Sequence, residues 1–174
     1  MNLYDASVPS FVNMLQALEG IIDEAPAWAG AAGIEESHWV DAKLAPDMFD
    51  LKRQVQIFCD LALKGCERLA GKEPQSIADT ETTAAELKAR IARTIKELQA
   101  LDRTAFEGAE SRTIVLPMPS GKISFPARVY LFEFVIPNFY FHASMFYANL
   151  RALGMPVSKQ HFLAGLKSYF EAEA

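Results

Sequence analysis

The polar side chains of one long apolar segment are the residues of this sequence best suited to chemistry. Asn138 and His142 are four positions apart, and Asn149 follows His142 by seven. On a helix that turns about 100° per residue, the three side chains fall within about 40° of one another. Such a face offers an imidazole, which can bind a divalent metal ion, and two amides, which can hydrogen-bond to a ligand.

Two interpretations of this polar face are open. In one, the side chains satisfy one another, nearby backbone groups or a buried water, because an unpaired buried amide costs about 1–3 kcal/mol. In the other, they line a ligand or metal pocket between facing helices, as in many helix bundles. The signal for a metal is weak. The three histidines, His38, His142 and His161, form no HxxxH pair, and no CxxC motif is present.

Length and charge restrict the class of protein. The chain has 174 residues, 51% of them hydrophobic, and a formal net charge of −5. We expect residues 1–174 to form a single domain with a substantial core. The acidic balance, without a dense cluster of Lys and Arg, argues against nucleic acid as a partner.

The cysteines and the N-terminus predict the compartment. Cys59 and Cys66 are the only cysteines, and on one helix their separation is about 10.5 Å, beyond the roughly 7 Å limit for a disulfide. We expect two reduced thiols that pack as small hydrophobic side chains. The first residues lack the basic and apolar regions of a signal peptide, so a cytoplasmic protein is predicted.

Apolar residues at spacings of three and four predict three long helices before residue 105. The first opens near Ser7 and ends near Pro26, and the stretch from Trp28 to Lys43 is predicted as a connection with a short extended piece. The second begins around Pro46-Asp47 and is closed by Gly71. The third begins at Thr83, which has capping-box spacing to Glu86, or slightly earlier at Asp79-Thr80, and runs to about Leu101. Its charges are predicted on a solvated face: Lys88, Arg90, Arg93, Lys96 and Glu97.

The pattern changes after residue 112. Residues 113–116 and 122–125 flank Pro117–Gly121 and predict a small β-hairpin. A long apolar helix follows from about Arg128 to Leu153, in which Pro137 predicts a kink or a break that starts a new helical stretch. A short helix is predicted around residues 160–170. Four long helices with short connections predict an all-α four-helix bundle.

The long apolar segment is as long as a membrane span, but it contains Glu133 and several other polar residues. We therefore expect a helix enclosed by other helices and no membrane partner. One helix cannot bury all of its rings within its own bundle, which favours a homodimer. These rings are Phe132, Phe134, Phe139, Tyr140, Phe141, Phe146 and Tyr147.

Three stretches carry a resemblance to a known family. They are LAPDMFDLKRQVQ (Leu44–Gln56), FEGAESR (Phe106–Arg112) and IPNFYFH (Ile136–His142), with Leu150-Arg151-x-x-Gly154 after the last. Together with the order of helices and hairpin, they resemble an uncharacterised branch of the DinB/YfiT-like four-helix-bundle superfamily over residues 1–166. The resemblance implies a DinB-like bundle with a small β-hairpin before the last long helix.

Members of that superfamily bind a divalent metal through three histidines, and these positions fall here on His142, Asn138 and approximately Gln54. The resemblance thus implies a zinc or nickel site at His142 that has lost two imidazoles, and with them most of its affinity. We expect no bound cofactor and a small-ligand-binding or interaction module, with Gln54, Asn138, His142 and Asn149 as its site. The alternative is a divalent-metal-dependent enzyme, similar to the superfamily's thiol transferases or hydrolase-like members.

Overall fold

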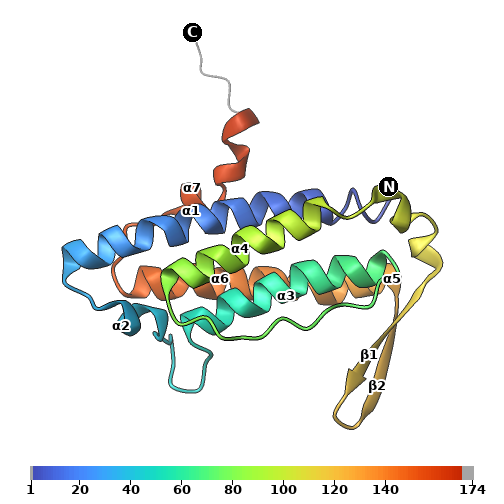
Figure 1. Cartoon of the computed structure of the whole chain (residues 1–174), viewed down its shortest axis with the longest axis horizontal. Coiled ribbons are helices and arrows are strands. Elements are labelled where there is room, and N and C mark those ends of the chain that lie inside the picture. Colours follow the sequence, from blue (N-terminus) through green and yellow to red (C-terminus); the bar gives the residue numbers. More distant parts are fainter. Residues whose placement is uncertain (1, 170–174) are drawn as a thin grey trace.

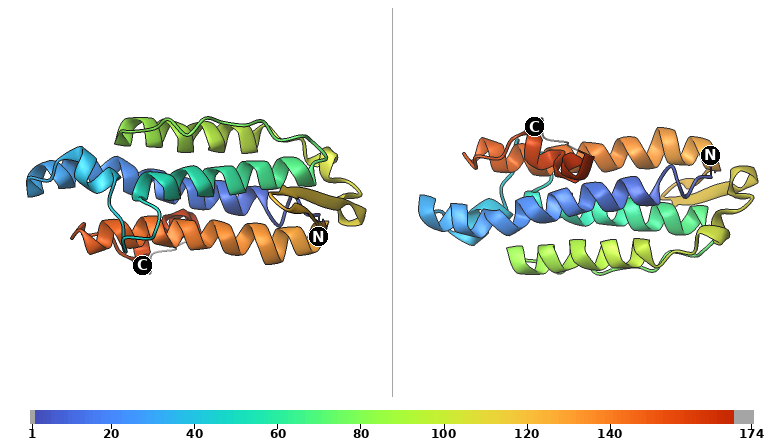
Figure 2. Two further views of the ribbon diagram at one scale, coloured as in Figure 1. Left: turned by 90° about the horizontal axis from the view of Figure 1, so that it is seen from below. Right: turned by 90° about the horizontal axis from the view of Figure 1, so that it is seen from above.

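A computed structural model describes residues 2–169, and its four long helical segments lie side by side (Figure 1). They are α1 (Val8–Ala32), α3 (Leu51–Leu69), α4 (Ala84–Gln99) and α6 (Ile136–Ala152). α1 packs mainly on α4, α4 also on α3, and α3 also on α6, an arrangement visible from two further sides in Figure 2. The predicted all-α four-helix bundle is confirmed.

Shorter elements connect and flank the bundle. Two 3-10 turns, η1 and η2, and a two-stranded hairpin lie between α4 and the last long segment. In chain order, all the shorter elements are α2 (Glu36–Val40), η1 (Arg103–Phe106), η2 (Ala109–Ser111), β1 (Thr113–Met118), β2 (Gly121–Pro126), α5 (Ala127–Val129), η3 (Tyr130–Val135), α7 (Lys159–Phe162) and η4 (Ala164–Tyr169). The hairpin projects from one end of the bundle (Figure 1).

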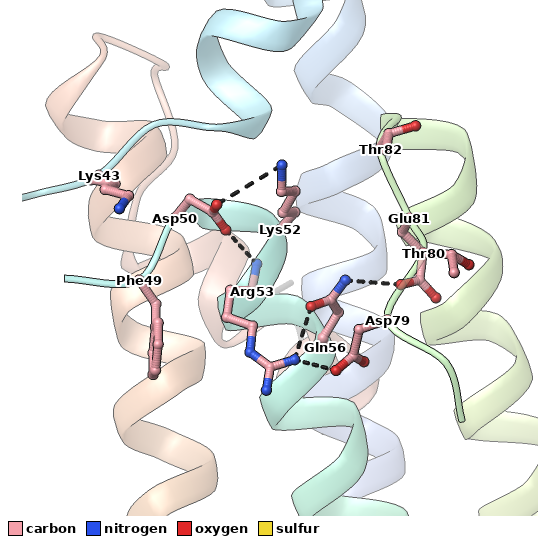
Figure 3. A pocket seen from close by; sticks show the side chains of 10 residues that line it. All are labelled: Lys43, Phe49, Asp50, Lys52, Arg53, Gln56, Asp79, Thr80, Glu81 and Thr82. Carbon is pink, nitrogen blue, oxygen red and sulfur yellow. Dashed lines mark hydrogen bonds and ion pairs between the residues drawn. The ribbon is translucent and has the colours of Figure 1, made fainter. Parts of the chain in front are cut away.

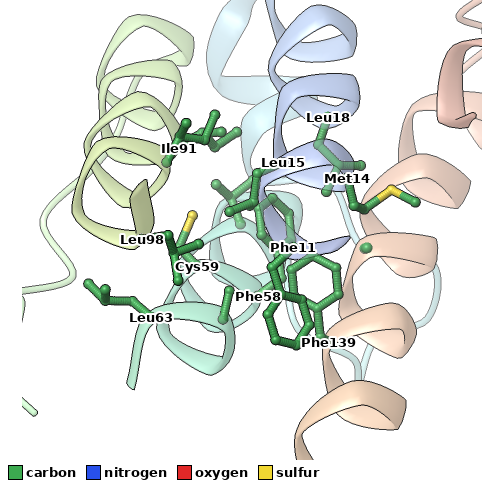
Figure 4. Packing of buried hydrophobic residues seen from close by; sticks show 14 of the residues in the cluster. Phe11, Met14, Leu15, Leu18, Phe58, Cys59, Leu63, Ile91, Leu98 and Phe139 are labelled. Atoms are coloured by element: carbon green, nitrogen blue, oxygen red, sulfur yellow. The ribbon is translucent and has the colours of Figure 1, made fainter. Parts of the chain in front are cut away.

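Buried rings from three helices meet in the core (Figure 4). The centroids of Phe11 on α1 and Phe139 on α6 are 4.8 Å apart, and those of Phe58 on α3 and Phe139 are 6.1 Å apart. The apolar face of α6 is therefore covered by its neighbours. Among residues 2–169, no helix combines the length and apolar character that a membrane span needs.

Both cysteines lie on α3, where they are free and buried. Burial raises the pKa of the Cys59 and Cys66 thiols to about 12, so both remain protonated at neutral pH. The prediction of two reduced thiols that pack as hydrophobic side chains is confirmed.

The prediction that the first helix ends near Pro26 is wrong. α1 continues through Pro26 to Ala32, and Gly33 closes it in the left-handed region with φ 68°. Alanine is the strongest helix former, and the alanine-rich residues 27–32 carry the helix past the missing backbone donor. The predicted extended piece before Lys43 is also wrong, since α2 forms there and buries Trp39.

The two middle helices begin at capped residues. α3 begins later than predicted, at Leu51, because the Asp50 carboxylate accepts a hydrogen bond from the Arg53 backbone N–H at 2.9 Å. Gly71 follows α3 in the left-handed region, as predicted, with φ 74°. α4 begins after Thr83, whose capping box with Glu86 is confirmed.

The last long helix changes its hydrogen-bond pattern before Pro137 but stays helical from Ala127 to Ala152. η3 is a stretch of π-helix in which the Ile136 N–H bonds to the Leu131 carbonyl, and α6 then begins with Pro137 in its first turn. A new α-helical stretch thus starts at Pro137, as one of the two predicted outcomes has it, but the backbone does not break there. A proline in the first turn loses no helical bond, because that N–H has no partner within the helix.

η3 approaches α3 closely at Gly65. A Cβ at this position would lie 2.8 Å from Val135 Cγ1, so a glycine is required for the contact. The predicted β-hairpin is also confirmed, with Ile114 paired to Phe125 and Leu116 paired to Ile123.

The C-terminal helix is shorter than predicted. α7 ends at Phe162 and a 3-10 turn follows to Tyr169. The predicted end at Phe170 lies outside the described residues.

Candidate functional site

The first turn of α3 places a buried amide against α6. The Asp50 cap fixes the start of α3, and Gln54 lies one turn further with only 1% of its surface exposed. Its Nε2 donates a hydrogen bond to the Phe49 carbonyl at 3.1 Å. Because a carbonyl oxygen only accepts, this bond orients the amide and directs Oε1 toward α6.

His142 on α6 completes the pair. Its Nδ1 lies 2.7 Å from Gln54 Oε1, and His142 is 9% exposed. Since Oε1 is an acceptor, Nδ1 must carry the proton and donate this bond. The structure thus brings together two of the predicted site residues, which are 88 positions apart in the chain.

The environment keeps the imidazole neutral. Burial, with a smaller contribution from the positive charge of Arg53, lowers the pKa of His142 from its ordinary value of 6.5. In the neutral ring with a proton on Nδ1, Nε2 has a free lone pair. Within residues 2–169, Nε2 has no hydrogen-bond partner. It is also not fully enclosed by the protein, so solvent or a ligand can reach it. The pair therefore presents one hydrogen-bond acceptor at the surface.

Two half-exposed rings belong to residues next to this pair. Phe141 is 53% exposed, and its ring centroid lies 5.2 Å from that of His142 in an edge-to-face arrangement. Phe49, which holds the Gln54 amide through its carbonyl, is 55% exposed. Exposed apolar rings near a polar atom are typical of small-molecule sites.

The other two predicted site residues bond within their own helix. Asn138 Nδ2 donates to the Phe134 carbonyl at 3.0 Å, and Asn149 Nδ2 donates to the Met145 carbonyl at 2.9 Å. Among the described residues, neither amide shares a hydrogen bond with His142. The polar face of the helix is thus three separate groups, of which only His142 is bonded to another helix.

The donor set does not fit the metal that the superfamily resemblance implies. Gln54 Oε1 is engaged by the imidazole, and Asn138 offers only a neutral amide oxygen, which is a poor ligand for zinc. Across residues 2–169, no three His, Cys, Asp or Glu side chains lie close enough together to hold a metal ion. One imidazole nitrogen is too few for a stable zinc or nickel centre, which takes about four ligands.

A second buried polar cluster, which the sequence analysis missed, centres on Arg90 of α4. The guanidinium bonds to Glu81 at 2.9 Å, Asp60 at 2.8 Å and Asp79 at 3.0 Å, and its side chain is 2% exposed. The prediction that Arg90 lies on a solvated face is wrong. Arg90 lies three positions after Leu87 and four before Thr94, and it shares their buried side of the helix. This spacing could have indicated that Arg90 is buried.

Two partners of Arg90, Asp79 and Glu81, also line a surface cleft of about 580 Å³, whose lining side chains are drawn in Figure 3. Arg53 pairs with Asp79 there, and its guanidinium also donates to Gln56, which donates to Glu81 at 3.0 Å. Lys52 pairs with Asp41 outside the cleft. The charges in this cleft thus compensate one another, which indicates that they attach residues 79–82 to α3 and α4.

The sequence matches the family described as "Domain of unknown function (DUF1993)" over residues 3–163. The chain belongs to the DUF1993 family. A crystal structure described as a DinB family member protein from Shewanella denitrificans is 36% identical to this DUF1993 chain, with a TM-score of 0.89. The match covers 98% of this chain and 96% of that one, which confirms the DinB-like resemblance. No curated protein matches the chain.

Proposed function

We propose that this DUF1993 protein is a binding module whose site is the His142–Gln54 pair. The ligand is a small aromatic molecule that donates an N–H or O–H group to His142 Nε2. The observation that carries the proposal is the 2.7 Å bond from His142 Nδ1 to Gln54 Oε1. In the neutral ring this bond assigns the N–H proton to Nδ1 and leaves Nε2 as an acceptor.

The surroundings of Nε2 favour a neutral ligand. The positive charge of Arg53 acts on His142, and its guanidinium carbon lies 5.9 Å from the centroid of the Phe49 ring. This charge disfavours a cationic ligand. The exposed rings of Phe49 and Phe141 supply apolar contact on which an aromatic ring can pack.

Metal content separates this proposal from a metal-dependent enzyme of the DinB-like superfamily. Protein purified without a histidine tag should contain far less than one zinc or nickel ion per chain by elemental analysis. We expect His142→Ala to leave that content unchanged. Near-stoichiometric metal that disappears in His142→Ala would support the enzyme and contradict the degenerate site.

Indole and 1-methylindole form a matched pair of probes for the acceptor, because only indole has an N–H. In a titration followed by NMR, we expect indole to shift the side-chain signals of His142 at millimolar concentration and 1-methylindole to bind more weakly. His142→Phe should remove the difference between the probes. Equal binding of both probes, or no binding of indole, would contradict the proposal.

We also propose a homodimer in the cytoplasm. Phe139 and Phe146 are fully buried within the bundle, but Phe132 of the same long segment is exposed and available to a second copy. Two free buried thiols suit a reducing compartment. Sedimentation equilibrium should show a dimer that Phe132→Ser weakens, whereas a monomer at all concentrations would exclude this assembly.

A further inference from the structure

A second cleft lies at the opposite end of α3 from Gln54, between the end of that helix and β1. Its volume is about 490 Å³, and it is lined by cationic side chains and by the first strand of the hairpin. The residues that matter here are Arg68, Lys72, Arg112, Thr113, Val115 and Pro117.

In the described part of the chain, the cationic side chains of this cleft form no ion pairs with carboxylates, unlike Arg90. Within residues 2–169, no carboxylate forms an ion pair with Arg68, Lys72 or Arg112, although the chain is acidic overall. Glu73 is the one carboxylate among the lining residues. The cleft therefore carries an excess of positive charge, which attracts an anionic group.

Both guanidinium groups of the cleft, those of Arg68 and Arg112, are held in place by hydrogen bonds. Arg112 Nη1 donates to the carbonyls of Ala105, at 3.0 Å, and Leu69, and a Cβ at Gly71 would lie 3.5 Å from its Cζ. Arg68 Nη1 donates to the Tyr130 hydroxyl at 3.3 Å. A guanidinium has five donors, and Arg112 Nη2 also donates to the Glu107 carbonyl at 3.4 Å, so two donors of Arg112 and four of Arg68 remain for a ligand. Positions fixed in advance lower the entropic cost of binding.

The strand beside these cations has an open backbone edge. The Ala127 N–H donates to the Arg112 carbonyl at 3.0 Å, so in this antiparallel register every second residue from Arg112 faces β2. The peptide groups of Thr113 and Val115 therefore point away from β2. Pro117 also falls on the outward set, where a residue without an N–H is tolerated.

The outward residues of β1 line the cationic cleft, so a strand added to this edge would run beside Arg68, Lys72 and Arg112. We propose that this cleft binds an extended, acidic peptide segment of a partner protein. The segment pairs with the peptide groups of Thr113 and Val115, and its carboxylates bind the cations. Main-chain pairing supplies affinity and the charges supply specificity, as in other cases of strand addition.

The test uses three acetylated, amidated hexapeptides and the full chain. The first peptide is Thr-Val-Thr-Val-Glu-Glu, the second replaces both Glu with Gln, and the third is the first peptide N-methylated at two successive residues, which blocks strand pairing. Titration to millimolar concentration is followed by the backbone amide signals of the protein. We expect the acidic peptide to shift Thr113 and Val115, and the other two to bind more weakly.

Variants of the protein locate the charge effect. Arg68→Gln and Lys72→Gln should each weaken binding of the acidic peptide about three- to fivefold, the range for partly exposed ion pairs. Lys122→Gln is the matched control, because it removes a cation from the other strand of the hairpin and should change nothing. Circular dichroism and thermal unfolding check that each variant is folded.

Several results would overturn the proposal. They are equal binding of the acidic and Gln peptides, undiminished binding of the N-methylated peptide, an equal loss in Lys122→Gln, or no shift at millimolar peptide. Shifts at Thr113 and Val115 that grow with protein concentration alone would assign the edge to a second copy of this chain instead.

Discussion

Arg90 and His142 are buried polar side chains that both contact α3, but their surroundings differ. Arg90 meets three carboxylates, and these have further partners, such as Lys64 at 2.6 Å from Asp60. His142 is neutral and meets a single amide, and its second ring nitrogen has no partner among residues 2–169. A compensated charge cluster serves the fold, whereas a neutral pair with one free acceptor can serve a ligand.

The largest expected effect is a loss in the free energy of unfolding when the Arg90 cluster loses its central cation. Arg90→Met leaves the carboxylates of Asp60, Asp79 and Glu81 close together without their central cation. We expect a loss of about 3 kcal/mol in the free energy of unfolding, measured by urea denaturation, because breaking a buried ion pair from one side is strongly destabilising.

Arg93→Met is the matched control on the same helix. Arg93 forms an exposed pair with Glu97 at 2.7 Å, so its loss should cost at most about 0.5 kcal/mol. Equal losses for the two arginine variants would show that the Arg90 cluster contributes no more to the fold than a surface ion pair does.

A smaller effect is expected at the neutral pair. His142→Phe leaves Gln54 Oε1 buried without a donor and should cost about 1–2 kcal/mol in urea denaturation. The double variant Gln54→Leu, His142→Phe removes both partners and should be less destabilised than the sum of the two single variants. Additive losses would mean that the 2.7 Å bond contributes no coupling energy.

The smallest effect is a dependence of stability on pH. The pKa of His142 is lowered in the folded protein, so between its folded value and 6.5 the unfolded chain binds more protons. The contribution of His142 to stability should be complete above pH 6.5 and decline as the pH falls from 6.5 to the folded pKa. The difference in unfolding free energy between wild type and His142→Phe should shrink over this range, and a constant difference would contradict the assigned shift.

The sequence predicted the parts of the fold that depend on local spacing. The three apolar stripes before residue 105, the Thr83 capping box and the hairpin around Pro117–Gly121 are all set by neighbouring residues. The end of α1 was not predicted, because the propensity of the alanines after Pro26 outweighs the missing backbone bond. Arg90 was missed because its carboxylates come from α3 and the segment before α4, and a charge pattern within one helix cannot indicate them.

The candidate site was predicted only in part. Gln54 was paired with His142 through the superfamily resemblance, and the structure places them in contact. The spacing of Asn138 and Asn149 put them on the same side of α6, but spacing does not show that each amide bonds to its own helix. The exposed ring of Phe49 lies in an irregular segment, where no periodicity predicts which side chains are exposed.

The protonation of the His142 ring tests the central claim most directly. A proton–nitrogen correlation spectrum of the histidine side chains at pH 7 identifies which nitrogen carries the proton. We predict a neutral ring with the proton on Nδ1 and a bare Nε2, unchanged by one equivalent of zinc. A proton on Nε2, or a metal-bound Nε2 at one equivalent, would contradict the account.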